Sequence, residues 1–549
     1  MSLFRRRTLL LHGACTALAA LAACAGSRAA APAALPVRAA PRLKLGAPQP
    51  FSWDGLVQRA RTLAAQPHRL ESALPAAVIE RIDYEQHGRL RFKPEYALFR
   101  DGPGPFPVTF FHLGRFFPVP VHMHVLEGAA GASQPQNARE LLYDPAYFDM
   151  PPDSPARELP AGAGFAGFRF QESRLGGAGA PDWRTHDWVA FLGASYFRAI
   201  GALNQYGISA RGIAIDVAVP AREEEFPRFT HFWFEPPADG SRRATVHALL
   251  DGPSVTGAFR FQLQRDQAVT MDVEQQLFLR RDVARLGLAP LTSMYWYSET
   301  FGARGADWRP EVHDSDGLAL WTGGGERVWR PLNNPPATRA SQFNDRSPKG
   351  FGLMQRDRAF NHYQDGVHYE RRPSLWVEPV GDWGEGSVQL IEIPTDDEIH
   401  DNIVACWVPA APARQGQQLA LRYRLHWVDD EPFAPPLARC GATRVGRGGQ
   451  PGHPRPPGVH KFMVEFSGGE LAKLPLGVKP EAVLSAASGR FSDVFTEPVP
   501  NGVPGHWRAQ FDYTPAESRG EAVDLRLFLR DGARTLSETW LYQLNPVAA

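Results

Sequence analysis

The stretch DDEIHDNIVACW, residues 396–407, places four carboxylates and a histidine directly before an apolar run. Its acids are Asp396, Asp397, Glu398 and Asp401. Neighbouring carboxylates raise one another's pKa, so one of them can keep a proton near neutral pH and act as a general acid. The alternative is that these acids cap turns and pair with nearby arginines. Spacing alone favours neither interpretation.

The region around this stretch, residues 305–410, mixes acids, arginines, amides and aromatic rings densely. RPEVHDSDGLALW, at 309–321, holds His313, Asp314 and Asp316 before an alternating pattern. The segment 351–379 adds a further set: Arg356, Asp357, Tyr363, Tyr369, Arg372 and Trp376. Aromatic rings stack on the C–H faces of sugars, and two separated carboxylates can supply the acid and base that cleave a glycosidic bond. The mixture therefore points to a carbohydrate site.

Two further motifs lack the sequence context that their usual functions require. Gly162–Gly167 matches GxGxxG, but Phe168-Arg-Phe170 continues as a strand, so we expect a glycine turn and no dinucleotide fingerprint. His362 and His368 could ligate a metal, yet two histidines on a loop are more often polar contacts. We therefore expect no metal site.

Most of the chain shows the two-residue period of strands with one buried face. Three runs carry it most clearly: Phe259, Phe261 and Leu263; alternate residues from Leu419 to Trp427; and alternate residues from Val523 to Leu529. One exception is 53–67, where Leu56, Val57, Ala60, Leu63 and Ala64 recur at helical spacing. With 51 glycines and 50 prolines punctuating the runs, the pattern predicts an all-β protein built of sandwiches.

A chain of 549 residues is too long for one core, so we expect two domains. The acidic and proline-rich stretch 429–440 is the predicted linker. It would separate a β-sandwich at 51–428, carrying the dense region, from an immunoglobulin-like sandwich at 441–549. The Gly/Pro-rich stretch 446–458 is expected to be a long loop of the second domain.

The N-terminus reads as an export signal. Residues 1–31 have a basic start, a short apolar run and small residues after it, and Arg6-Arg7-Thr8 fits a twin-arginine pattern. Cleavage near Ala31 competes with lipidation at Cys24, which lies in a lipoprotein-like box; we favour cleavage. Residues 32–50 are expected to be a flexible Ala/Pro-rich leader. No later segment is apolar for long enough to cross a membrane.

The charge and the cysteine content bear on three further properties: nucleic-acid binding, membrane binding and disulfide formation. The net charge is zero, which gives no electrostatic footprint for nucleic acid and no polybasic membrane patch. Outside residues 1–31 the chain has two cysteines, Cys406 and Cys440. They could pair in an oxidising compartment or remain free thiols, and the sequence leaves both open.

The chain resembles the periplasmic glucan biosynthesis proteins G and D. The matching stretches run in order from about residue 50 to 545: FLGASYFRA (191–199), QYGISARGIAID (205–216), EEFPRF (224–229), PLTSMYWY (290–297), RPEVHDSDGL (309–318), WRPLNNP (329–335), RRPSLWVEP (371–379), DNIVACW (401–407) and LSETWLYQL (536–544). The twin-arginine leader makes the chain more similar to the D branch.

The resemblance implies a galactose-mutarotase-like fold for the larger sandwich and a periplasmic location. It also implies a role in making or trimming osmoregulated periplasmic glucans, with inverting hydrolysis of β-1,2-glucan and no metal or organic cofactor. By motif, Asp401 matches the general acid and Asp314 the general base, which would reach its water through a hydrogen-bonded relay. Tyr369 and Glu398 fall at positions expected to hold substrate or support the acid. Arg372 and Trp376 are added from residue type as sugar-facing candidates.

Two functions therefore compete. In the first, the protein is a glycoside hydrolase, and inversion requires carboxyl groups roughly 6.5–9.5 Å apart. In the second, the same surface binds glucan without cleaving it, as a scaffold partner of the inner-membrane glucan synthase. The C-terminal sandwich lacks the acid cluster and is the candidate for that contact.

Overall fold

The computed structural model describes residues 42–549 except 70–73, 103, 129–135, 177–178, 239, 301–306, 517–520 and 546–549. The predicted signal peptide at 1–31 and the leader up to residue 41 lie outside the described residues. Strands supply most of the regular structure, which confirms the all-β prediction. None of the helices in the described ranges has the length and hydropathy needed to cross a membrane.

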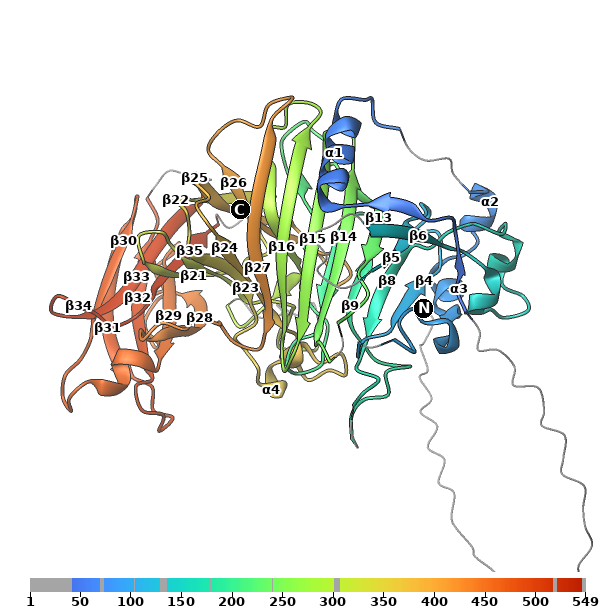
Figure 1. Ribbon diagram of the computed structural model, residues 1–549. Coiled ribbons are helices and arrows are strands. Elements are labelled where there is room, and N and C mark those ends of the chain that lie inside the picture. Colours follow the sequence, from blue (N-terminus) through green and yellow to red (C-terminus); the bar gives the residue numbers. More distant parts are fainter. Residues whose placement is uncertain are drawn as a thin grey trace, which may run out of the picture. The chain divides into compact units, whose positions relative to one another are not determined.

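The first sheet follows one continuous path of paired strands. Its order is β6 (Gln136–Leu142), β5 (His122–Glu127), β13 (Arg228–Phe234), β14 (Arg243–Asp251), β15 (Val255–Arg265), β16 (Val269–Leu279), β27 (Gln418–Val428), β24 (Ser374–Val380), β23 (Gly350–Met354), β20 (Gly317–Trp321) and β21 (Arg327–Pro331). Figure 1 shows the long strands β14, β15, β16 and β27 side by side. The alternation predicted within β15 and β27 is confirmed.

The second sheet is antiparallel throughout. Its order is β22 (Arg339–Arg346), β25 (Glu385–Glu392), β26 (Ile403–Pro409), β17 (Leu286–Ser293), β11 (Ser209–Arg211), β10 (Tyr196–Ala199), β9 (Asp187–Leu192), β8 (Gly167–Gln171) and β4 (Val108–Phe111). β12 (Ala214–Ile215) also pairs with β17. β8 begins where the glycine motif ends, after Gly162 and Gly164 at positive φ, so the predicted turn is confirmed.

The two sheets enclose the main core. Phe168 of β8 lies 4.9 Å from Phe232 of β13, and Phe191 of β9 lies 5.2 Å from Phe261 of β15, between ring centroids. All four rings are buried. Because neighbouring strand residues point to opposite faces, the residues that flank these phenylalanines face outward.

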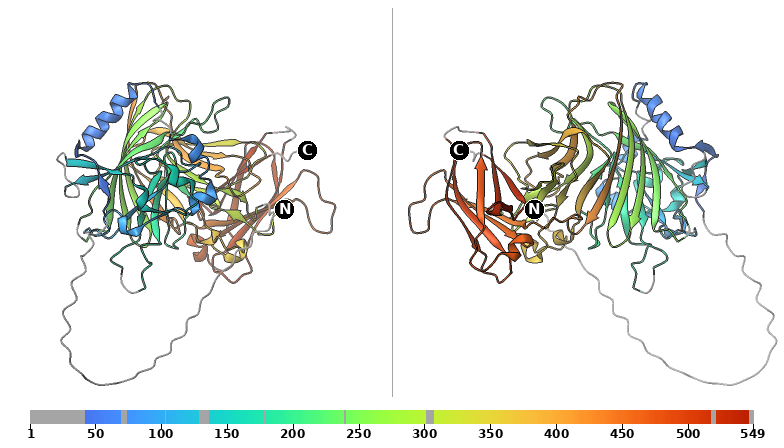
Figure 2. Two further views of the ribbon diagram at one scale, coloured as in Figure 1. Left: turned by 90° about the vertical axis from the view of Figure 1, so that its right-hand side faces the viewer. Right: turned by 60° about the vertical axis from the view of Figure 1, so that its left-hand side comes forward.

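Helix α1 (Trp53–Ala64) confirms the predicted amphipathic helix. Ser52 caps its start by accepting a hydrogen bond from the Gly55 N–H, and the helix packs Leu56 and Ala60 onto the first sheet's outer face. Figure 2 shows the helix lying along those strands. The remaining short elements are α2 (Ala76–Ile79), α3 (Tyr84–Gly88), α4 (Phe360–Tyr363), β3 (Arg91–Phe92) and β7 (Phe148–Asp149).

The expected flexible leader is corrected in its described part. β1 (Lys44–Leu45) and β2 (Gln49–Phe51) both pair with β6. Residues 44–45 and 49–51 thus lie in strand ladders that the Ala/Pro-rich composition did not reveal.

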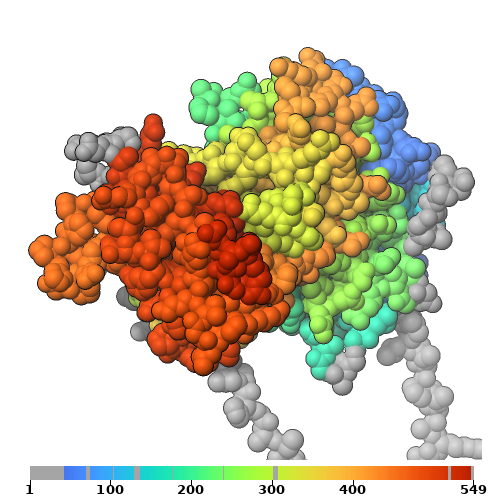
Figure 3. All heavy atoms as spheres, turned by 90° about the vertical axis from the view of Figure 1, so that its left-hand side faces the viewer, coloured from blue at the N-terminus to red at the C-terminus, as the bar shows by residue number. Residues whose placement is uncertain are grey.

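A second sandwich follows β27. One layer is β28 (Arg439–Arg447), β29 (His460–Ser467), β32 (Trp507–Thr514) and β31 (Arg490–Pro498); the other is β30 (Glu481–Ala486), β33 (Val523–Asp531), β34 (Arg534–Thr535) and β35 (Thr539–Leu544). Phe462 and Phe511 of the first layer pack on Trp540 of the second. β35 also pairs in parallel with β21, so C-terminal residues lie beside the yellow-green segment in Figure 3. The domain boundary at 429–440 stays a prediction; residues 429–438 connect β27 to β28, and the last two residues of the stretch belong to β28.

Both cysteines outside the signal region are buried and free. Cys406 lies on β26 and Cys440 on β28. Burial raises the pKa of the Cys406 thiol to about 12. Of the two states left open by the sequence, the structure has the unpaired one.

Candidate active site

Two short hydrogen-bonded connections bring Asp314 and Asp401 together. Asp314 follows β19 (Val312–His313), which pairs with β18 (Tyr295–Tyr297), and its N–H donates to the Met294 carbonyl at 2.8 Å. Asp401 precedes Asn402, whose amide accepts from the Tyr295 N–H at 2.8 Å and donates to the Tyr295 carbonyl at 2.9 Å. Both acids are therefore tethered to adjacent backbone positions, 294 and 295, although they lie far apart in sequence.

Asp314 is a buried carboxylate with a cationic partner. Its side chain forms an ion pair with Arg372. Burial raises the pKa of Asp314, while the Arg372 guanidinium, His313 and Arg198 lower it and leave a net upward shift. Arg372 thus favours the ionised form, which is the form that a general base needs.

Asp401 differs because it has no hydrogen bond or ion pair with any described residue. Its side chain is accessible to solvent, yet protein surrounds the carboxylate closely enough that burial raises its pKa. The negative charge of Asp314 raises the pKa of Asp401 further, against Arg211, Arg198 and Arg372. The charge of Asp314 thus acts on Asp401, which has no hydrogen bond or ion pair with a described residue.

Glu398 and Tyr369 connect to the same cluster. The Tyr369 hydroxyl donates to Glu398 at 2.5 Å, and Arg309 donates to Glu398 at 2.8 Å. Burial raises the pKa of Glu398, but these two hydrogen bonds lower it by more, so the net shift favours the ionised carboxylate. The Arg372 guanidinium lies 4.1 Å from the centre of the Tyr369 ring. Four of the six predicted site residues, Asp314, Arg372, Tyr369 and Glu398, thus form one chain of contacts.

Trp376 is the exception, and its expected sugar-facing role is corrected. The side chain is completely buried in the second hydrophobic cluster. A Cβ added at Gly350 would come within 2.3 Å of its indole, so the ring lies directly on the β23 backbone. Residue type suggested a stacking platform, but strand alternation places this ring in the core.

The acids of residues 396–401 have two kinds of environment: some lie in a turn, and others belong to the candidate site. Asp396 and Asp397 are exposed, and Asp397 accepts a hydrogen bond from the Glu398 N–H at 2.6 Å, as a turn cap does. Glu398 and Asp401 belong to the site. The charge that raises the pKa of Asp401 comes from Asp314, not from its sequence neighbours.

A groove lies on the outer face of the second sheet, and Arg198 in its wall lowers the pKa of both Asp314 and Asp401. A cavity of about 510 Å³ is lined by Tyr196 and Arg198 of β10 and by Ser209 of β11, among others. Arg211, whose guanidinium lies 4.6 Å from the Tyr196 ring centre, lowers the pKa of Asp401. Sequence reasoning missed these residues as site members. The buried Phe197 between Tyr196 and Arg198 was the signal that both point outward.

One group of side chains could hold a cation. Ligand atoms of Glu311, Asp357 and His362 lie within 4.8 Å of one another, and the Asp357–His362 pair is hydrogen bonded at 2.5 Å. His368 instead contacts Glu370 at 3.0 Å, a polar contact of the expected kind. A carboxylate and imidazole set of this kind suits a divalent transition metal. The expectation of no metal and no cofactor stays a prediction.

Comparison with known proteins shows which family the chain belongs to. The fold and site define a two-sandwich β protein with two aspartates tethered to adjacent backbone positions and a polar and aromatic groove on the second sheet. The family model described as "Periplasmic glucan biosynthesis protein, MdoG" matches residues 51–544. The chain belongs to this family, as its motifs indicated, and the family description places its members in the periplasm.

Curated relatives cover the chain almost completely. "Glucans biosynthesis protein D 2" of Ralstonia nicotianae is 64% identical over 509 residues, covering 92% of this chain and 93% of the relative. "Glucans biosynthesis protein D" of Xanthomonas campestris is 45% identical over 549 residues, covering 99% of each. The protein of the same name from Stenotrophomonas maltophilia is 47% identical over 509 residues, covering 92% of each. Their shared name agrees with the expected D branch.

Proposed function

We propose that this protein is a periplasmic, inverting β-1,2-glucan hydrolase that shapes the backbone of osmoregulated glucans. The observation that carries the proposal is the Asp314–Asp401 pair. Asp314 forms an ion pair with Arg372, which favours its ionised form, whereas Asp401 is accessible to solvent, has no hydrogen bond or ion pair with a described residue, and has a raised pKa. Unequal environments of this kind assign base and acid roles to two carboxyl groups.

In the proposed reaction, Asp401 donates its proton to the glycosidic oxygen as the C–O bond breaks. Asp314 receives a proton from the water that attacks the anomeric carbon on the opposite face of the sugar, directly or through a hydrogen-bonded relay. Glu398, fixed by Arg309 and Tyr369, holds the substrate close to the acid or supports the acid's position. No step needs a metal or an organic cofactor.

Two further assignments belong to this proposal. Export would follow from the twin-arginine signal at residues 1–31, with cleavage near Ala31 giving a periplasmic product. The substrate would be the linear β-1,2-linked backbone, and the inner-membrane glucan synthase is the proposed source of that chain.

Release of reducing ends from linear β-1,2-glucan tests the proposal. We expect activity in the wild type and a loss of about 10²–10⁴-fold in Asp401→Asn and in Asp314→Asn, the usual contribution of a general acid or base. The exposed acid Asp396, changed to Asn, is the matched control and should retain activity. Equal rates in the wild type and Asp401→Asn would refute the acid role.

The second candidate is a glucan-binding scaffold without turnover. The polar and aromatic groove beside Tyr196 and Arg198 would serve binding equally well. Glucan binding without cleavage, unchanged by Asp401→Asn, would favour this alternative.

A further inference from the structure

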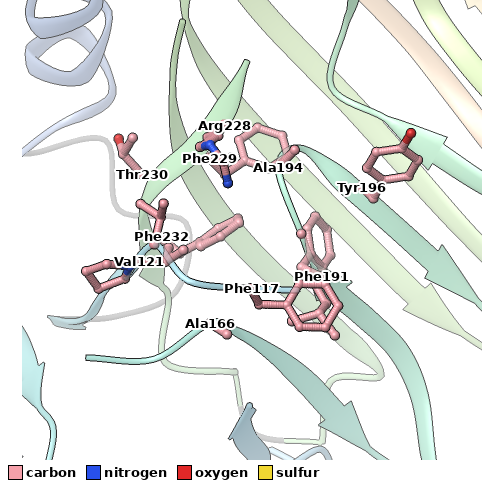
Figure 4. A pocket seen from close by; sticks show the side chains of 14 residues that line it. Phe117, Val121, Ala166, Phe191, Ala194, Tyr196, Arg228, Phe229, Thr230 and Phe232 are labelled. Atoms are coloured by element: carbon pink, nitrogen blue, oxygen red, sulfur yellow. The ribbon is translucent and has the colours of Figure 1, made fainter. Parts of the chain in front are cut away.

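The residues behind Asp314 contrast with the apolar main core. Figure 4 shows a pocket at that core whose walls are mostly aromatic and aliphatic, among them Phe191, Phe229 and Phe232. Directly before Asp314, by contrast, His313 is completely buried and both of its ring nitrogens contact polar groups. Buried polar groups are costly unless each one has a partner, so a fully paired cluster fixes one arrangement of its members.

Gln355 is the centre of this cluster. It follows β23, is 1% exposed, and its N–H donates to the Ser374 hydroxyl at 3.0 Å, where β24 begins. Its side-chain Oε1 accepts a hydrogen bond from His313 Nδ1 at 2.9 Å. Its Nε2 donates to the His313 and Tyr369 carbonyls, each at 3.1 Å, and to the Tyr363 hydroxyl at 3.0 Å. Because carbonyls only accept hydrogen bonds, these partners fix the orientation of the amide.

The two carbonyls that Gln355 binds belong to the backbone beside site residues. The His313 carbonyl is part of the peptide group that joins His313 to Asp314, and the N–H of that group donates to the Met294 carbonyl at 2.8 Å. The backbone of the proposed base is therefore held from both sides. The Tyr369 carbonyl belongs to the residue whose hydroxyl donates to Glu398 at 2.5 Å. One buried amide thus connects the base to the Tyr369 side of the site.

The side chains of the same two residues also meet through Arg372. Its guanidinium forms an ion pair with Asp314 and lies 4.1 Å from the centre of the Tyr369 ring. A long arginine side chain has many rotamers and can follow its partners when they shift, so this contact alone does not fix their separation. Gln355 supplies the missing constraint, since it binds both backbones from a buried position.

We propose that Gln355 is a positioning residue for glucan hydrolysis, which holds Asp314 and Tyr369 at a fixed separation. The inference rests on the proposed function for its reaction, and it adds a residue that acts from the buried side of the site through its neighbours. The effect of Gln355 on the rate passes through Asp314, because a general base is effective only when it is held close to the proton that it receives.

Gln355→Met tests this role, because it removes the donor and the acceptor and keeps the length of the side chain. On linear β-1,2-glucan we expect kcat to fall about 10²-fold with KM within about twofold, the cost of misplacing a reacting group by about 1 Å. In an Asp314→Asn background the same substitution should change the residual rate by less than about twofold, because the positioned base is already lost. The matched control is Gln171→Met, at a buried amide that contacts the Thr109 hydroxyl at 2.6 Å, and it should leave kcat unchanged.

Crystal structures of the variants give a readout that needs no activity. In Gln355→Met, the peptide group before Asp314 and the Tyr369 backbone should shift by about 1 Å, whereas Asp401 should stay in place because Asn402 holds it. Gln355→Glu keeps an acceptor for His313 and loses the donor to the two carbonyls. It should show the same displacement and the same loss in kcat, and it carries the test if Gln355→Met does not fold.

The results separate this proposal from the proposed function. Unmoved Asp314 and Tyr369 backbones, or an unchanged kcat beside an active wild type, would overturn the positioning role while leaving hydrolysis intact. A loss in kcat of equal size with Asp314 and with Asn at that position would overturn it as well, because a purely structural defect is additive. Absence of reducing-end release by the wild type would sink the hydrolase, and the crystal structures would still decide whether Gln355 sets the separation of Asp314 and Tyr369.

Discussion

At the scale of residues, the site depends on the contrast between two aspartates. Arg372 compensates Asp314 inside the protein, whereas Asp401 meets the solvent without a protein partner. Burial raises the pKa of both, but only Asp314 has a protein partner that compensates its charge. This contrast separates a catalytic role from a structural one.

The raised pKa of Asp401 determines whether its ionisation stabilises or destabilises the folded protein. The folded protein keeps the Asp401 proton to a higher pH than the unfolded chain, whose ordinary value is 3.8. Stability is therefore lost as the pH rises from 3.8 through the folded pKa, and ionised Asp401 is a cost at neutral pH. We predict that Asp401→Asn unfolds at the same or a higher temperature than the wild type at pH 7, with the difference vanishing near pH 3.8. A lower unfolding temperature at pH 7 would contradict this environment.

Arg372→Met should be destabilising because it leaves the buried Asp314 carboxylate without its counter-charge. We expect a loss of about 3 kcal/mol in the free energy of unfolding at pH 7. Denaturation by urea measures it, and Asp314→Asn combined with Arg372→Met should recover part of the loss. A neutral effect of Arg372→Met alone would show that the ion pair is not formed in solution.

At the scale of elements, the acids are positioned by the start of β26 and by the β18–β19 ribbon. Asn402 links the two, since its buried amide makes three hydrogen bonds to backbone groups of Tyr295 and Ile393. The site is thus held by one side chain between two neighbouring segments, rather than by the long strands of the core.

Replacement of Asn402 by alanine should loosen that link. Because three buried hydrogen bonds are lost and their backbone partners stay behind, we expect a destabilisation of about 2–4 kcal/mol, measured by urea unfolding. Glucan cleavage should fall as well, since Asp401 is the adjoining residue. Asn344→Ala, at an exposed position of β22, is the control and should change neither. Full activity in Asn402→Ala would mean that Asp401 is positioned by other contacts.

The same elements show what sequence reasoning could and could not reach. Alternation predicted β15, β27 and β33 correctly, because one face of each strand is buried and the other is not. The site residues on β10 were missed because alternation says which residues point outward but not which outer face lines a groove. Trp376 was misplaced for a related reason: only the tertiary structure shows that its ring packs on the glycines of β23.

At the scale of the whole molecule, the C-terminal strands are joined to the site region by buried charges as well as by the β21–β35 pairing. Arg356 donates to Glu538 at 2.6 and 3.1 Å, and the Cys440 N–H donates to Glu538 at 2.6 Å. Arg356 also lies 3.7 Å from Glu431. These contacts connect residues on both sides of the predicted linker.

Glu538→Ala should therefore destabilise the molecule strongly. The change leaves the buried Arg356 guanidinium partly uncompensated, and we expect a loss of about 3–5 kcal/mol in the free energy of unfolding. Chemical denaturation followed by tryptophan fluorescence measures it, with the exposed Glu481→Ala of β30 as control. A loss as small as that of the control would imply that the two sandwiches hold together without this contact.

The central claim, cleavage with inversion by Asp314 and Asp401, is tested most directly by the anomeric form of the first product. Proton NMR during hydrolysis of linear β-1,2-glucan should show the α-anomer of the new reducing end first, with the β-anomer appearing as mutarotation proceeds. Initial appearance of the β-anomer would mean retention, and it would contradict the assignment of one aspartate as acid and the other as base toward water.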